Sequence, residues 1–257
     1  MPQIDHPKRE LLCGGPESYT GLPTMYCPGC HYGTVARVIC EAIDELGIKK
    51  QAIGVAGVGC HGFMIGTIAT DFVFALHGRG PGVATGIKRS LGGKPIVFTI
   101  QGDGDLAAIG MGDIINAIGR GEKLTTIFCN NAGYGTTGGQ MAPTTLLEQV
   151  TTTTPTGRDP QVAGYPIHVA EMLATLRGTV YSARGALTSR KNYNQTKKFL
   201  KLAFQKQIDG IGYGFVEILS ACPSTLRLPP NKALKWVEEY MVAEYPLGEF
   251  KNVDEIY

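Results

Sequence analysis

Two polar loops in this sequence carry the residue types that hold a divalent cation against a diphosphate. The first is Gly102-Asp103-Gly104-Asp105, and about 25 residues later comes Asn130-Asn131-Ala132-Gly133-Tyr134-Gly135. Mg²⁺ prefers hard oxygen ligands in near-octahedral geometry and often shares them with substrate phosphates. Asp103 and Asn131 each supply such an oxygen, and the exposed backbone at Gly133 can supply a third. The two loops therefore predict a magnesium site beside a bound diphosphate.

Each of these loops directly follows an apolar run with the character of a buried strand, at residues 95–100 and 124–129. The carboxyl ends of neighbouring parallel strands face the same crevice, which is where open α/β sheets bind ligands. Apolar strand-like runs alternate with helical periodicity along most of the chain, and this alternation predicts an α/β fold with a doubly wound, mostly parallel sheet. The expected strands are 52–58, 95–101, 124–130, 178–183 and 213–220, and the expected helices are 33–46, 62–69, 83–91, 106–119, 168–176 and 192–207.

The flanking segments have a different composition from this central part. Residues 1–24 have the glycines and prolines of an irregular arm, and residues 25–225 form the expected cofactor domain. We expect the tail, 226–257, to be helical over 231–242 and irregular after that. Residues 136–165 are predicted to be one long Thr/Gly/Pro loop, and loops of more than about 15 residues are usually functional or disordered.

Charge and composition exclude several classes of protein. The 257 residues carry a net charge of +2 and contain no basic run, which argues against nucleic acid or a membrane surface as a partner. No apolar stretch approaches the length of a membrane span, and the N-terminus lacks an apolar signal core. The sequence therefore predicts a soluble, cytoplasmic protein. In such a chain, seven cysteines argue for metal or redox chemistry rather than for a disulfide framework.

Four of the cysteines are expected to converge. Cys27-Pro28-Gly29-Cys30 precedes a predicted helix and is, by itself, compatible with a redox pair, half a zinc site or ligands of an iron–sulfur cluster. Cys60 and Cys222 each follow a predicted strand, so they emerge at the same sheet edge as the two polar loops. Four thiolates at that edge suit either Zn²⁺ or an iron–sulfur cluster.

Other chemistry-bearing side chains have plainer interpretations. Cys129 lies within an apolar strand and Cys40 within a helix, so both are predicted to be small core residues. Cys13 lies in the arm and receives no role. His77, in a His-Gly-Arg-Gly run, and His61, next to Cys60, are compatible with loop histidines or with neighbours of a cofactor.

The motifs occur in an order that resembles one family. The chain is similar to the β subunit of 2-oxoacid:ferredoxin oxidoreductases, which binds thiamine diphosphate and an iron–sulfur cluster, and the resemblance spans about residues 22–225. A departure follows Cys30, where His31-Tyr32 stands in place of the family's usual glycine. The motifs that carry the resemblance are Cys27-Pro28-Gly29-Cys30, Val58-Gly59-Cys60, His77-Gly78-Arg79-Gly80, Gly102-Asp103-Gly104-Asp105, Asn130-Asn131 and Thr137-Gly138-Gly139-Gln140.

The resemblance also implies roles for individual residues. A [4Fe–4S] cluster would be ligated by Cys27, Cys30, Cys60 and Cys222. Mg²⁺ would be held by Asp103, Asn131 and the carbonyl of Gly133. The side chains placed at the reacting centre would be His77 and His61. Thiamine diphosphate would be lined by Val58, Gly59, Cys60, His61, His77, Gly104, Asp105, Gly135 and Thr136.

In that family, a 2-oxoacid is oxidatively decarboxylated to an acyl-coenzyme A, or formed in reverse, and the electrons pass to ferredoxin. The sequence has room for one sheet, so a separate α-type chain is expected to supply the pyrimidine-binding domain and its activating glutamate. Further γ-type and ferredoxin-like δ-type chains are expected companions. We expect a branched-chain 2-oxoacid or 2-oxoglutarate as substrate. The alternatives are a non-redox thiamine diphosphate lyase or decarboxylase with a structural zinc site, and a cofactor-binding scaffold without activity.

Overall fold

The apolar runs of the sequence assemble into one sheet in the computed structural model, which describes residues 14–256. Within this part of the chain the strand order is β2-β1-β3-β4-β6-β5-β7. All neighbouring strands are parallel except β7, which pairs with β5 in the antiparallel direction. The strands are β1 (Ala52–Ala56), β2 (Asp71–Phe74), β3 (Ile96–Gly102), β4 (Thr125–Asn130), β5 (Thr179–Ala186), β6 (Tyr213–Leu219) and β7 (Gly248–Asn252).

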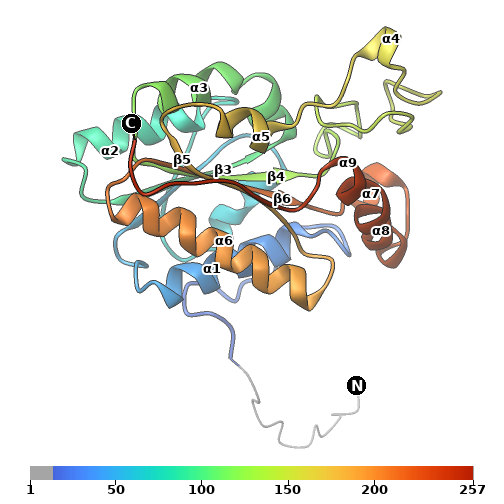
Figure 1. Cartoon of the computed structure of the whole chain (residues 1–257). Helices are drawn as coiled ribbons and strands as arrows, with labels where there is room; N and C mark the ends of the chain where they lie inside the picture. Colours follow the sequence, from blue (N-terminus) through green and yellow to red (C-terminus); the bar gives the residue numbers. More distant parts are fainter. Residues whose placement is uncertain (1–13, 257) are drawn as a thin grey trace, which may run out of the picture.

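Helices cover both faces of this sheet, as Figure 1 shows. One face is covered by α1 (Tyr32–Glu45) and α6 (Arg190–Ile208), which also contact each other. The opposite face is covered by α2 (Gly80–Ser90), α3 (Met111–Gly119) and α5 (Val169–Ala174). The predicted α/β class with a doubly wound, mostly parallel sheet is therefore confirmed.

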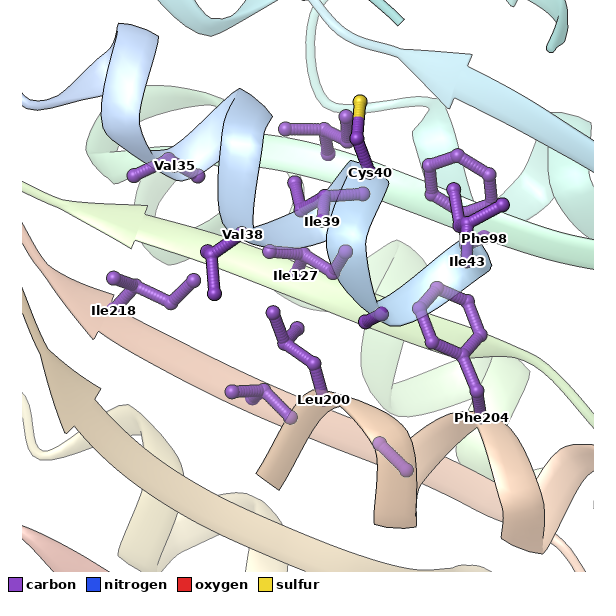
Figure 2. Close-up of a cluster of buried hydrophobic side chains, with 14 of the residues drawn as sticks. Val35, Val38, Ile39, Cys40, Ile43, Phe98, Ile127, Leu200, Phe204 and Ile218 are labelled. Carbon is purple, nitrogen blue, oxygen red and sulfur yellow. The ribbon is translucent and has the colours of Figure 1, made fainter. Parts of the chain in front are cut away.

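The core beneath α1 and α6 explains why the central strands read as continuous apolar runs. Figure 2 shows the side chains of α1 and α6 meeting those of β3 and β4 between the two layers. The rings of Phe98 and Phe204 meet edge to face, with their centroids 5.7 Å apart. Cys40 is fully buried in this cluster, as is Cys129 on β4, so the prediction that both are core residues is confirmed.

A separate hydrophobic cluster closes the carboxyl edge of the sheet. Residues from the ends of β5 and β6 pack there against a short run of helices, which lies at the right-hand end of the sheet in Figure 1. These helical segments are α7 (Pro223–Leu226), α8 (Pro230–Trp236), η3 (Val237–Met241) and α9 (Val242–Glu244). The cluster includes Ala132 and Tyr245. Residues 223–256, which we call the C-terminal segment, therefore pack directly against the loop that follows β4.

The structure corrects the sequence predictions at the sheet edges. Residues 248–252 were expected to be irregular but form β7, and β2 was not predicted at all. Both are short edge strands without a fully buried residue, so neither carries the apolar alternation by which strands are recognised. The predicted helix 106–119 is interrupted: η2 (Asp103–Ala108) is a π-helix, and α3 begins at Met111.

The remaining predicted elements are present with small shifts of their ends. The predicted short helix 62–69 is η1 (Cys60–Gly66), and the long loop after β4 contains α4 (Pro160–Ala163). The part of the N-terminal arm that the structure describes is attached to the body of the protein, since Tyr19 forms an antiparallel bridge with Ile68. Residues 1–13 of the arm, which include Cys13, lie outside the described residues. The domain boundaries at residues 24 and 225 stay predictions.

Among the helices of residues 14–256, none combines the length and the apolar character that a membrane-spanning helix requires.

Candidate active site

The loops that leave the carboxyl ends of β1, β3 and β4 surround a cavity of about 470 Å³. β3 is the neighbour of both β1 and β4, so parallel pairing brings the three loops to one edge of the sheet. Every residue predicted to line the cofactor stands around this cavity, as do the three predicted magnesium ligands. The predicted residues that line it are Val58, Gly59, Cys60, His61, His77, Asp103, Gly104, Asp105, Asn131, Gly133, Gly135 and Thr136.

Three oxygen-bearing groups converge at the base of this cavity. The side-chain amide of Asn131 presents one of its two polar atoms to Asp103 and Gly133, at 2.7 Å from the carboxylate Oδ2 and 2.7 Å from the carbonyl oxygen. If that atom is Nδ2, it donates to both oxygens. If it is Oδ1, three oxygens face one another and Nδ2 donates to the hydroxyl of Tyr32 at 3.1 Å. The second orientation is a cation-binding arrangement.

The turn that carries Asn131 and Gly133 has an unusual backbone. Ala132 has a φ of 58°, a left-handed conformation that costs a non-glycine residue about 1 kcal/mol or more. The turn is stabilised by its neighbours: the N–H of Ala132 donates to Asn130 Oδ1 at 3.0 Å. Its carbonyl accepts from Thr145 Oγ1 at 2.8 Å and from Gln149 Nε2 at 3.1 Å. These contacts aim the Asn131 side chain and the Gly133 carbonyl at Asp103.

Asp103 is buried, with 3% of its surface exposed. Burial raises the pKa of its carboxyl group to about 7, although hydrogen bonds from Thr144 Oγ1 and the Asn131 N–H act in the opposite direction. A buried carboxylate without a cation partner is costly, and a bound cation would favour its ionised form. The donor set therefore fits a divalent cation.

The second carboxylate of the Gly-Asp-Gly-Asp loop organises the two predicted histidines. Asp105 Oδ1 lies 2.9 Å from His77 Nδ1 and accepts the N–H of Gly78 at 2.8 Å. Its Oδ2 accepts from Gln101 Nε2 at 3.0 Å and lies 3.6 Å from His61 Nε2. Burial by itself would raise the pKa of Asp105, but the contacts from His61, Gly78 and Gln101 outweigh it and hold the pKa below its usual range.

The contact between Asp105 and His77 determines how His77 meets the cavity. A carboxylate oxygen only accepts, so Asp105 Oδ1 favours the tautomer that carries a hydrogen on His77 Nδ1 and leaves Nε2 free of this contact. The side chain of His77 is 43% exposed and lines the cavity, whereas that of His61 is 3% exposed. The two histidines therefore differ: His77 is accessible to a ligand, and His61 packs beneath Asp105.

The four predicted thiols lie beside the same edge of the sheet. Cys60 lines the cavity, and its Sγ lies 3.0 Å from Thr136 Oγ1. Cys222 follows β6, with its Sγ 3.0 Å from Thr225 Oγ1. A side chain added at Gly135, which lines the cavity, would come within 3.5 Å of Cys222 Sγ, so the thiols and the cavity share one wall.

The four thiols also influence one another electrostatically. The pKa of the Cys30 thiol is raised to about 12, mainly by burial, and the neighbouring cysteines Cys222, Cys60 and Cys27 act in the same direction. Cys222 is affected in the same direction, first by burial and then by Cys60 and Cys27. Within residues 14–256, no three His, Cys, Asp or Glu side chains already stand in an arrangement that could hold a metal ion.

Sequence reasoning missed several residues of this site. Tyr32, Ile109 and Tyr134 line the cavity, and Thr144 bonds Asp103 from the long loop. Tyr32 belongs to the pair His31-Tyr32 at which the sequence departs from the resembled family, and it bonds Asn131; that departure was the available signal. Thr144 carried no signal, because it reaches Asp103 only through the fold of the loop.

The long loop after β4 is ordered by one arginine. Arg158 is 4% exposed, and its guanidinium donates to five backbone carbonyls of the loop. They belong to Pro143, Thr145, Ala163, Gly164 and Tyr165. Fixing this loop places Thr144 against Asp103 and Thr145 against Ala132, so the loop is part of the site.

Comparison with known proteins agrees with this geometry. Residues 51–216 match the family model for the thiamine pyrophosphate enzyme, C-terminal TPP binding domain. This match includes both polar loops but excludes Cys27, Cys30 and Cys222. A solved 2-oxoglutarate:ferredoxin oxidoreductase from Magnetococcus marinus, with 2-oxoglutarate, coenzyme A and succinyl-CoA bound, shares the fold. The TM-score is 0.74 at 24% identity, covering 93% of this chain and 85% of that chain.

Two curated relatives extend the match. The chain is 34% identical to the 2-oxoglutarate synthase subunit KorB of Methanocaldococcus jannaschii, covering 91% of this chain and 89% of KorB. It is 45% identical to the ketoisovalerate oxidoreductase subunit VorA of Methanothermobacter marburgensis over 89% of this chain. The chain spans about half of VorA, 48% of its length. The chain therefore belongs to the thiamine pyrophosphate enzymes, in the group of 2-oxoacid oxidoreductase subunits that includes KorB and VorA.

Proposed function

We propose that this chain is the thiamine diphosphate-binding subunit of a 2-oxoacid:ferredoxin oxidoreductase. The reaction is the coenzyme A-dependent oxidative decarboxylation of a 2-oxoacid, or its reverse. The observation that carries the proposal is the convergence of Asp103, Asn131 and the Gly133 carbonyl at the base of the cavity.

The three oxygens fit a magnesium ion that holds a diphosphate. Neighbouring ligands of an octahedral Mg²⁺ ion are about 2.9 Å apart, since each lies about 2.1 Å from the metal. The observed 2.7 Å separations on Asn131 are close to that spacing. When bound, thiamine diphosphate supplies the electron sink for loss of CO₂. The tasks of this chain are to hold the diphosphate end and to line the pocket in which the ring lies.

His77 is the residue that we assign to proton transfer and hydrogen bonding at the reacting centre. Its Nδ1 is held by Asp105, so Nε2 can accept a proton or a hydrogen bond from a ligand in the cavity. His61 is the second residue that we assign to the reacting centre. Its Nε2 lies 3.6 Å from Asp105 Oδ2, and it lines the same cavity. The two histidines thus lie next to different oxygens of one carboxylate.

Cys27, Cys30, Cys60 and Cys222 are the proposed ligands of a [4Fe–4S] cluster. Their mutual effect on thiol pKa supports a shared site, and the contact of Gly135 with Cys222 supports its closeness to the cofactor. Held by these four thiols, such a cluster would supply a one-electron acceptor between the thiamine diphosphate pocket and ferredoxin. The alternative is a structural zinc site in a non-redox thiamine diphosphate lyase or decarboxylase.

The lining of the cavity favours a 2-oxoacid with an apolar side chain. Among the described residues that line it, none is Lys or Arg, so this chain offers no cation for a second carboxylate such as that of 2-oxoglutarate. Val58 and Ile109 supply apolar surface instead. The higher identity to VorA than to KorB supports the same choice, and we propose a branched-chain 2-oxoacid as substrate.

The rest of the active site comes from other chains in this proposal. An α-type subunit supplies the pyrimidine-binding domain, and γ-type and ferredoxin-like δ-type subunits complete a cytoplasmic complex. The described residues form one sheet, and its polar loops are the ones to which we assign the diphosphate.

The proposal is tested by reconstitution. The native complex should reduce ferredoxin when given 3-methyl-2-oxobutanoate, coenzyme A, thiamine diphosphate and Mg²⁺, and should be slower with 2-oxoglutarate. The isolated chain should reduce no ferredoxin with either substrate, because in this proposal the α-type subunit supplies the carboxylate that activates the cofactor ring. Comparable turnover by the isolated chain would disprove the shared active site.

A further inference from the structure

Arg184 on β5 is a cation with no exposed surface, held between the sheet and the C-terminal segment. Its Nε donates to Glu217 Oε2 at 2.8 Å, and its terminal nitrogens donate to both carboxylate oxygens of Glu171. The guanidinium carbon lies 5.1 Å from the ring centre of Tyr245. Two chains of contacts lead from this arginine toward the cavity. The residues that connect Arg184 to Asn131 and to Asp103 do not themselves line the cavity.

The first chain of contacts leads to the turn that carries Asn131. Glu217 on β6 accepts Arg184 with one oxygen, and with the other it accepts Asn130 Nδ2 at 2.7 Å. The carbonyl oxygen of the same Asn130 side chain accepts the N–H of Ala132 at 3.0 Å. Glu217 therefore fixes the orientation of the Asn130 amide, which in turn holds the left-handed Ala132.

The second chain of contacts leads to Asp103. The ring of Tyr245 packs on Arg184, and its hydroxyl donates to the carbonyl of Thr144 at 2.7 Å. The side-chain hydroxyl of Thr144 then donates to Asp103 Oδ1. Arg184, Glu217, Asn130, Tyr245 and Thr144 have no exposed surface, so water does not compete for these bonds.

We infer that Arg184, Glu217 and Tyr245 are positioning residues that set the separation of the Asp103 and Asn131 oxygens from opposite sides. This inference rests on the proposed magnesium–diphosphate site. The C-terminal segment thus controls the affinity of the site for Mg²⁺ without contacting the cavity. Groups that orient metal ligands from behind commonly change metal affinity about 10- to 100-fold when they are removed.

The energetics of a buried ion pair agree with such a role. A buried Arg–Glu pair often adds little to stability compared with apolar residues of similar volume. What this pair adds is direction, since Glu217 orients Asn130 and Arg184 packs on Tyr245. A purely structural role would require neither the amide of Asn130 nor the hydroxyl of Tyr245 to be aimed at the metal-binding loops.

The test is the Mg²⁺ dependence of thiamine diphosphate binding to the native complex, measured by calorimetry. Tyr245→Phe removes one hydroxyl and keeps the ring on Arg184. Its matched control is Tyr181→Phe, because Tyr181 is equally buried and its hydroxyl also bonds the C-terminal segment, at Glu249 Oε1, 2.8 Å away. Glu217→Gln tests the other chain of contacts and serves if Tyr245→Phe does not fold.

We expect the Mg²⁺ concentration for half-saturation to rise about tenfold in Tyr245→Phe and in Glu217→Gln, with full cofactor binding restored by excess Mg²⁺. The Tyr181→Phe complex should stay within about twofold of the wild type. Equal shifts of this Mg²⁺ concentration in the two tyrosine variants, or an unchanged value in Tyr245→Phe, would overturn this inference and leave the proposed function standing. A wild-type complex that binds the cofactor without Mg²⁺ would overturn the proposed function, and the inference with it.

Discussion

His77 Nδ1 lies 2.9 Å from Asp105 Oδ1, and this contact joins the loop after β2 to the Gly-Asp-Gly-Asp loop after β3. Asp105 is therefore not a magnesium ligand in this arrangement, although it lies two residues from Asp103. It accepts hydrogen bonds from Gly78 and Gln101 as well, so both of its carboxylate oxygens already have partners among these two residues and the histidines. The two aspartates of one short motif have different contacts: Asp103 faces Asn131, at the proposed cation site, and Asp105 contacts His77.

Replacing Asp105 should impair turnover more than cofactor binding. In Asp105→Asn, His77 loses the carboxylate that holds its Nδ1 proton, so the ring can adopt the other tautomer. We expect kcat of the native complex to fall about 10²-fold or more, with Kd for thiamine diphosphate changed much less. The matched control is His168→Gln, because His168 also contacts carboxylates, Glu171 and Glu244, but lies outside the cavity. An equal loss of kcat in the control would argue against the role of Asp105.

Removing Asp103 should abolish cofactor retention while the fold persists. Burial raises the pKa of this carboxyl group, so the fold gains little from it without a cation, and Asp103→Ala should melt close to the wild-type temperature. Thiamine diphosphate affinity with Mg²⁺ present, measured by calorimetry, should fall at least about 100-fold. Asp113→Ala is the control, since Asp113 pairs with Arg79 and does not line the cavity. Wild-type affinity in Asp103→Ala would refute the magnesium assignment.

Four cysteines should be required for iron and two should not. Replacing Cys27, Cys30, Cys60 or Cys222 by Ala should each lower iron and acid-labile sulfide in anaerobically purified protein. Cys40→Ala and Cys129→Ala should leave both unchanged, because these thiols lie within the hydrophobic core.

The metal content separates this proposal from its alternative. If the wild-type protein contains zinc and no acid-labile sulfide, the four cysteines form a structural zinc site and the proposed [4Fe–4S] cluster is wrong. Cys60 is the most informative position, since it also lines the cofactor cavity. Its replacement should stop ferredoxin reduction even where loss of CO₂ continues.

The pairing of Glu171 with Arg184 predicts a dependence of stability on acid pH. Burial alone would raise the pKa of Glu171, but the hydrogen bonds and charge of Arg184 outweigh it and hold the pKa below its usual range. Stability from this ionised group is present above its unfolded pKa, about 4.3, and is lost as the pH falls through the folded value. Glu171→Gln should therefore be less stable at pH 7, by about 1 kcal/mol because the side chain is partly exposed. By pH 3 the difference in thermal midpoint between the wild type and Glu171→Gln should have narrowed. A difference that does not change with pH would show that the pairing of Glu171 with Arg184 is not its cause.

Much of the candidate site was predictable because its signals are local. Glycine-rich loops that follow apolar strand runs mark the carboxyl edge of a parallel sheet. Such loops are recognised from consecutive residues, so no contact between distant parts of the sequence is needed to predict them. The cavity accordingly contains both polar loops, His61, His77 and Cys60, all named from the sequence. Cys40 and Cys129 were recognisable as core residues for the same reason, since their neighbours are apolar.

Only the tertiary structure decided how these loops are held. Thr144 reaches Asp103 across 41 residues and Tyr245 reaches Thr144 across 101, so no local pattern could reveal either bond. The edge strand β7 was likewise invisible, because an exposed strand paired on one side lacks the apolar alternation of a buried one. Local sequence determined which groups stand at the ends of the strands. The packing of the C-terminal segment and the long loop decided their orientation, because a buried polar group takes the direction in which its hydrogen bonds are satisfied.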